Sequence, residues 1–140
     1  MNIVNLNKEQ GVALGLIVLA VVTRLIPHPP NFAPITGIAL FAAARFQSKG
    51  LAILIPFLGL FLTDLVLGLS AISFFVYIGF GLILFLGFRT KRTTVPTTMF
   101  SSILFFVVSN LGVWLIYYPL SLEGLISCFT LAIPFFTNTL

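Results

Sequence analysis

The sequence predicts an all-α, polytopic membrane protein, a bundle of about six transmembrane helices that forms a single membrane domain over residues 1–140. Hydrophobic residues make up 59% of the chain and charged residues only 7%, whereas a soluble domain carries about 25% charged residues. Long apolar runs alternate with short polar or proline-containing breaks, and several runs approach the roughly 20 residues that a membrane-spanning helix needs. These two observations carry the prediction of fold class.

The first half of the chain contains three apolar runs. The first, residues 11–27, ends at a proline-rich segment, residues 28–34. That segment cannot be helix interior, because proline lacks a backbone donor and restricts the residue before it. The second run, residues 35–46, is short for a span, and we expect it to start within the membrane, packed on protein. The third run, residues 51–71, contains Pro56 and Asp64.

The second half predicts three further helices. Small uncharged residues between Leu69 and Ser73 predict a tight turn, after which a fourth span runs to about Phe88. A basic loop over residues 89–94 precedes the fifth span, about 98–118, which carries Asn110. The sixth run begins at Leu125 and is still apolar at the end of the sequence, so we expect this helix to be short or cut off.

The basic residues predict the orientation of the bundle. Only Arg24 falls within the set of spans and loops that faces outward; the other basic residues fall in the N-terminal segment and in the second and fourth loops, and they are Lys8, Arg45, Lys49, Arg89, Lys91 and Arg92. Cytoplasmic loops carry an excess of lysine and arginine, so we expect a cytoplasmic N-terminus and a proline-rich segment outside. Because these residues are scattered among apolar runs, the pattern does not favour nucleic-acid binding.

The chain lacks the residue sets of common catalytic and metal sites. It has one cysteine, Cys128, and one histidine, His28, too few for a zinc centre or a disulfide framework. We expect Cys128 to be a small buried residue. Glu9 and Glu123 are predicted at opposite membrane faces, and no HExxH or phosphate-binding motif is present. We therefore expect no enzymatic activity, no cofactor and no bound metal.

Three polar residues on different spans, Arg24, Asp64 and Asn110, are expected at similar depths in the outer half of the bilayer. Ionisable residues inside a membrane are costly unless paired or hydrated, so Arg24 is expected to reach Asp64. Three interpretations are open. The pair locks two helices together, or it lines a ligand cavity open to the outside, or Arg24 extends to the surface without a partner.

Three further residues are candidates for the same outward-facing site. Asn110 is either a hydrogen-bonding contact between helices or a ligand contact, and the nearby Trp114 is either an interfacial anchor or a stacking wall for a flat ligand. The proline-rich segment is either a rigid turn or a cover over the site. As a cover, it offers Asn31 as the polar contact and Phe32 as the apolar one.

Small residues spaced by four occur as Gly11 with Gly15 and as Ala39 with Ala43. Small side chains allow two helices to approach closely. The two spacings therefore predict either packing inside the bundle or a docking face for another membrane subunit.

The sequence resembles a known family over nearly its whole length. The residues that carry the resemblance are RLIPHPPNFAPI at 24–35, Asp64, SNLGVW at 109–114 and IPFFTNTL at 133–140. They resemble a family of small bacterial integral membrane proteins of unassigned function. That family is in turn distantly similar to the substrate-binding S components of energy-coupling factor (ECF) vitamin transporters.

The resemblance implies an S-component-like bundle in the bacterial inner (cytoplasmic) membrane, with a binding site formed by outer loops. Its implied partners are a transmembrane coupling subunit and ATPase subunits, in addition to a small-molecule ligand and membrane lipid. We therefore expect a subunit that binds a vitamin or micronutrient, with the ligand-binding residues Arg24, Asn31, Phe32, Asp64, Asn110 and Trp114. The alternative is a non-transporting accessory or structural subunit of a larger membrane complex. No vitamin-binding motif carries over, so the substrate is not specified.

Overall fold

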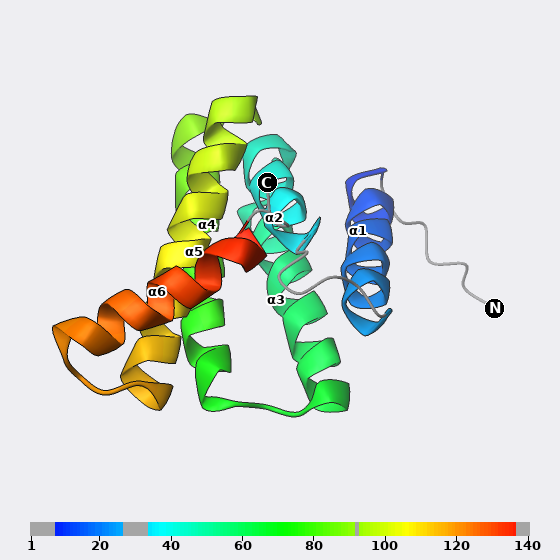
Figure 1. Cartoon of the computed structure of the whole chain (residues 1–140). Helices are drawn as coiled ribbons and strands as arrows, with labels where there is room; N and C mark the ends of the chain where they lie inside the picture. Colours follow the sequence, from blue (N-terminus) through cyan, green and yellow to red (C-terminus); the bar gives the residue numbers. More distant parts are fainter. Residues whose placement is uncertain (1–7, 27–33, 92, 137–140) are drawn as a thin grey trace.

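The computed structural model describes residues 8–26, 34–91 and 93–136, and within them it forms six helices and no strand. This confirms the all-α prediction and the number of helices. In chain order the helices are α1 (Lys8–Leu25), α2 (Pro34–Arg45), α3 (Lys49–Leu67), α4 (Ala71–Thr90), α5 (Val95–Tyr117) and α6 (Leu122–Phe136) (Figure 1).

The prediction that all six helices span a membrane is wrong, because among the helices of the described residues only α3, α4 and α5 are both long and apolar enough to do so. Helix α1 has 18 residues, but Lys8, Glu9 and Arg24 are among them. Helix α2 has 12 residues and α6 has 15. At 1.5 Å per residue these two reach about 18 and about 22 Å, short of a hydrocarbon core of about 30 Å. Three candidate spans nevertheless indicate a membrane protein.

Helices α1 and α3 run parallel to each other in a constant register. At one end, the Glu9 carboxylate accepts hydrogen bonds from the backbone N–H groups of Gln47 and Ser48 just before α3. At the other end, Arg24 meets Asp64. The sequence separation between partners is 38 to 40 residues in each of these contacts. The contacts therefore fix both the direction and the axial position of α1 on α3.

The short helix α2 packs against both α3 and α4. One of its faces is nearly all buried, at Ile38, Ala39, Ala42 and Ala43. A Cβ atom added to Gly87 on α4 would lie 2.5 Å from the Cβ of Ala43, so these two helices touch almost backbone to backbone. The spacing of Ala39 and Ala43 therefore serves packing inside the bundle.

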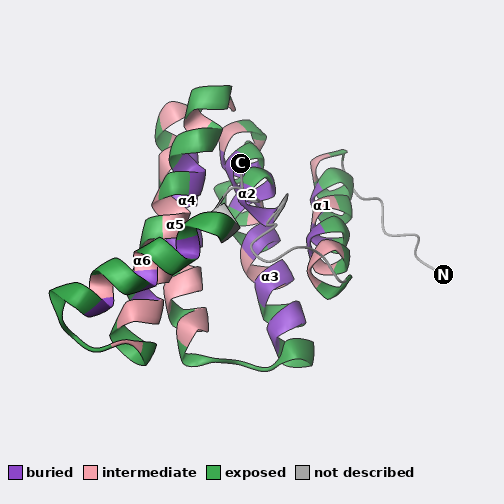
Figure 2. Cartoon of the chain, in the orientation of Figure 1, coloured by how far each residue is buried: buried purple, intermediate pink, exposed green. Residues whose placement is uncertain are grey.

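Each of the remaining two helices packs against the helix that precedes it in the chain. Helix α5 is antiparallel to α4, and the rings of Phe80 and Phe105 lie 5.0 Å apart between them. Among the described helices α6 packs against α5 alone, and it crosses the bundle obliquely in Figure 1. Figure 2 shows that buried residues concentrate where α2 and α3 meet their neighbours and that much of α6 and the outer side of α1 is exposed. Exposed apolar surface of this kind is expected where lipid is the solvent.

Local turn chemistry accounts for where the long helices begin and end. Helix α3 stops at Gly68, whose φ of +93° is unfavourable for residues with a side chain. The predicted tight turn is present, slightly earlier than expected, at residues 68–70. Helix α5 starts at a capping box in which Thr94 and Thr97 exchange side-chain and backbone hydrogen bonds.

The two ends of the bundle differ in charge. Lys49 begins α3, Arg45 ends α2, and Arg89 and Lys91 lie at the end of α4. We call this end the basic end. The opposite end, where α3 meets α4, holds the pair of Arg24 and Asp64, and we call it the Asp64 end. The predicted clustering of basic residues at one end is confirmed for the described part of the chain.

Candidate functional site

The candidate site begins with a close approach of α1 to α3. A Cβ atom added to Gly59 would lie 3.1 Å from the Cβ of Ala20, so only a residue without a side chain fits there comfortably. Both Ala20 and Gly59 are buried. Arg24 lies one turn beyond Ala20, and Asp64 lies a little more than one turn beyond Gly59. The small residues therefore bring the two charged residues within reach of each other.

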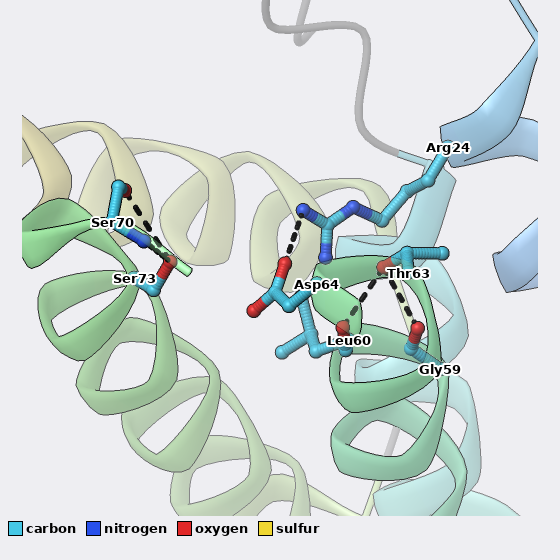
Figure 3. A network of polar contacts seen from close by, with 7 residues as sticks. All are labelled: Arg24, Gly59, Leu60, Thr63, Asp64, Ser70 and Ser73. Carbon is cyan, nitrogen blue, oxygen red and sulfur yellow. Dashed lines mark hydrogen bonds and ion pairs between the residues drawn. The ribbon is translucent and has the colours of Figure 1, made fainter. Parts of the chain in front are cut away.

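Arg24 and Asp64 form a direct ion pair at the Asp64 end. The distance from Arg24 Nη2 to Asp64 Oδ1 is 3.1 Å. The Asp64 side chain is 6% exposed and that of Arg24 is 26% exposed. Figure 3 shows the guanidinium reaching from α1 across to the carboxylate on α3. The predicted contact is confirmed, and the interpretation in which Arg24 reaches the surface without a partner is wrong.

The neighbouring Thr63 does not take part in this pair. Its hydroxyl donates to the backbone carbonyls of Gly59 and Leu60 at 2.9 Å, within its own helix (Figure 3). Thr63 therefore satisfies its own polar group without drawing on Asp64.

Two buried polar groups lack hydrogen-bond partners within the described residues. Arg24 Nη1 is buried and has no hydrogen-bond partner among the described residues. The buried hydroxyl of Thr36, near the start of α2, also lacks one within the same part of the chain. A buried polar group without a hydrogen bond costs about 1–3 kcal/mol. Arg24 lies at the end of α1 and Thr36 at the start of α2.

Tyr77 on α4 is a further member of this cluster, which the sequence interpretation missed. Its hydroxyl lies close enough to the Asp64 carboxylate for the two groups to interact. The ring centroids of Tyr77 and Phe57 are 5.7 Å apart. The signal was available in the sequence, because an antiparallel pair of helices joined by the turn at residues 68–70 places Tyr77 opposite the last turns of α3.

Asn110 and Trp114 lie elsewhere. Asn110 Nδ2 donates to the carbonyl of Phe106 at 2.7 Å, within α5. Trp114 Nε1 donates to the carbonyl of Pro119 at 3.1 Å and thereby fixes the turn before α6. Helix α5 contacts α2, α4 and α6, and within the described residues it contacts neither α1 nor α3. The structure therefore brings Arg24 and Asp64 together and leaves Asn110 and Trp114 on α5, apart from them.

Asn31 and Phe32 lie outside the described residues. Cys128 is buried, as predicted, and its Sγ lies 3.5 Å from the carbonyl oxygen of Asn110, where it helps to hold α6 on α5. Among residues 8–26, 34–91 and 93–136, no group of three histidine, cysteine, aspartate or glutamate residues is placed to hold a metal ion.

These observations define an α-helical membrane protein with a polar cluster at one end of its bundle. Comparison with protein families then places it more narrowly: the model of DUF6580, a family of unknown function, matches residues 4–140, and the chain belongs to that family. Comparisons with curated proteins and with solved structures gave no significant match. The family part of the predicted resemblance is thus supported, whereas none of these comparisons links the chain to ECF S components.

Proposed function

We propose that this protein is the small-molecule-binding membrane subunit of an ECF-type uptake transporter, and that it captures a vitamin or micronutrient at the Asp64 end. In this proposal the Asp64 end faces outward across the bacterial cytoplasmic membrane and the basic end faces the cytoplasm, as the distribution of lysine and arginine favours. The observation that carries the proposal is the pair of Arg24 and Asp64, in which Arg24 Nη1 has no hydrogen-bond partner within the described part of the chain. A pair that served only to lock two helices would be expected to satisfy its own donors.

The chemistry of the pair narrows the kind of ligand. Arg24 Nη1 offers N–H donors to a carbonyl, carboxylate or ring nitrogen, while Asp64 accepts from an N–H or O–H group. Because the two charges neutralise each other, the site favours a neutral or zwitterionic ligand over one with a net charge. Tyr77 and Phe57 add aromatic surface beside the carboxylate. A small polar ring compound with adjacent donor and acceptor atoms fits this set.

The other predicted ligand contacts enter the proposal with different roles. Asn31 and Phe32 belong to the segment that follows α1, and they are proposed to cover the ligand once it is bound. Asn110 and Trp114 use their side-chain N–H groups within α5 and the turn that follows it. They contribute to binding only if α5 moves toward α3, so the core of the proposed site is Arg24, Asp64 and Tyr77.

The proposed docking surface for the partner subunit lies on α1. Gly11 and Gly15 are exposed, and a Cβ atom added to either would meet nothing within 4 Å. A flat surface of this kind allows another membrane helix to approach closely. The same surface supports the second candidate function, an accessory subunit that binds no ligand and packs against a larger membrane complex.

The two candidates differ in what accompanies the purified protein. We would purify the full chain in a mild detergent, release bound small molecules by denaturation and identify them by mass spectrometry. Capture of a substrate predicts a polar small molecule present in near-stoichiometric amount. Recovery of large membrane subunits alone, with no small molecule, would favour the accessory subunit and contradict the proposal.

A further inference from the structure

A second feature lies between α3 and α4, on the side of the proposed ligand site that faces the basic end. A groove of about 360 Å³ runs between α3 and α4, and its lining is entirely apolar: Ile53, Phe57, Gly81, Leu84, Phe85 and Phe88. This volume lies within the range of roughly 300–1,000 Å³ typical of small-molecule sites. Apart from Phe57, which also borders the proposed ligand site, the lining residues have no role in the function proposed above.

The walls of the groove are two stripes with helical spacing. Lys49, Ile53 and Phe57 are spaced by four on α3, and Gly81, Phe85 and Arg89 are spaced by four on α4. Residues four apart lie on the same face of a helix. Each wall is therefore apolar toward the middle of the bundle and ends in a cation at the basic end.

Gly81 explains why the groove is open. A Cβ atom added there would meet nothing within 4 Å, so the absence of a side chain leaves space that no other group fills. Toward the Asp64 end, the Phe57 ring of the groove lies against the ring of Tyr77, with the centroids 5.7 Å apart. From these rings the two stripes that line the groove lead along α3 and α4 to Lys49 and Arg89.

The cations at the mouth have no acidic partner in the part of the chain that the structure describes. Arg89 lies over the ring of Phe85, with its Cζ 5.5 Å from the ring centroid, so its charge is held at the rim of the groove. Glu9, the acid at this end, accepts the backbone N–H groups of Gln47 and Ser48. An incoming anionic group therefore meets two uncompensated positive charges.

We propose that this groove binds one acyl chain of an anionic phospholipid, with the lipid phosphate held by Arg89 and Lys49. The dimensions fit a lipid of the leaflet at the basic end. From Gly81 to Arg89 the wall is about 12 Å long, most of the roughly 15 Å hydrocarbon depth of one leaflet. A basic rim above an apolar slot matches the charge and polarity of a phospholipid from headgroup to chain.

Native mass spectrometry of the full chain in detergent tests the proposal, with phosphatidylglycerol and phosphatidylcholine of identical acyl chains as probes. Wild-type protein should retain one phosphatidylglycerol molecule more strongly than phosphatidylcholine. Gly81→Leu fills the groove without a backbone clash. It should bind phosphatidylglycerol at least about tenfold more weakly, since the new side chain displaces several methylene groups. Arg89→Gln should reduce the preference for phosphatidylglycerol roughly fivefold.

Gly37→Leu is the matched control, because Gly37 is also exposed in a helix and a Cβ added there meets nothing within 4 Å. It should bind lipid as the wild type does. Equal binding of phosphatidylglycerol by Gly81→Leu and wild type would overturn the proposal. Equal losses of binding in the two leucine variants would overturn it as well, and so would wild-type protein that carries no lipid.

A photoreactive phospholipid tests the same proposal on wild-type protein, so the result does not depend on whether a variant folds. With the reactive group in the acyl chain, wild-type protein should be labelled in the peptides that contain Phe57 and residues 81–88. Labelling spread evenly over the exposed faces of all helices would show ordinary contact with bulk lipid and would equally contradict a specific site.

Discussion

At the scale of single residues, the structure depends on one buried pair of opposite charges. Asp64 is almost completely buried and Arg24 largely so, and each compensates the charge of the other at 3.1 Å. The pairing was predictable, because a lone charge in an apolar run needs a partner. Tyr77 was missed, although the turn after α3 places it opposite the end of that helix. Thr36, which has no hydrogen-bond partner among the described residues, could not be predicted, because its surroundings depend on how α2 packs.

Removing one charge of the pair should destabilise the fold, because the other charge then stays partly buried without a partner. Asp64→Asn should destabilise the fold by about 2–3 kcal/mol, less than the roughly 3–5 kcal/mol for a fully buried pair, because the Arg24 side chain is 26% exposed. Denaturant unfolding in detergent would measure this. Combining Asp64→Asn with Arg24→Gln should recover part of the loss, since no unpaired charge then remains. Strictly additive losses in the double variant would contradict a direct interaction.

At the scale of helices, the apolar runs and the turn residues predicted six elements in the right order. Their function as membrane spans was predicted less well. Helix α2 begins at Pro34 and ends at Arg45, so it has only 12 residues. It is supported by burial between α3 and α4, which composition alone cannot reveal. A run of apolar residues predicts a helix in an apolar environment, and both lipid and protein provide one.

The contact of α1 with α3 makes a prediction at this scale. Gly59→Val adds bulk where a Cβ would already lie 3.1 Å from that of Ala20, and it should separate the two helices. We expect a loss of stability of about 1–3 kcal/mol. Thermal unfolding followed by circular dichroism would report it. Gly37→Val, placed where the added carbon meets no neighbour, should unfold near the wild-type temperature. Equal shifts in the two variants would argue against close packing at Gly59.

At the scale of the whole molecule, the two ends of the bundle carry different polar groups. Basic residues gather at one end, and the pair of Arg24 and Asp64 lies at the other. The sequence predicted this polarity because loop charges alternate along the chain. It could not predict that Asn110 and Trp114 lie apart from Asp64. Similar depths along three helices do not specify which helices are neighbours, and α5 packs against α2, α4 and α6.

The proposed orientation can be tested by cysteine accessibility. In a Cys128→Ser background, Lys49→Cys at the basic end should react with a membrane-impermeant maleimide only after the cells are opened. Ser70→Cys, in the exposed turn between α3 and α4, should react in intact cells. The reverse pattern would place the Asp64 end in the cytoplasm and would exclude capture of a substrate from outside.

The central claim is that Arg24 binds a ligand through the donors that its ion pair leaves unused. Arg24→Lys tests this most directly, because lysine keeps the positive charge beside Asp64 but lacks the second terminal nitrogen of the guanidinium. The measurement is the amount of co-purified small molecule per protein for wild type and variant, together with the unfolding midpoint of each. We predict that Arg24→Lys unfolds near the wild-type midpoint and carries at least about tenfold less ligand. A variant that retains its full complement of ligand, or a wild type that carries none, would contradict the claim.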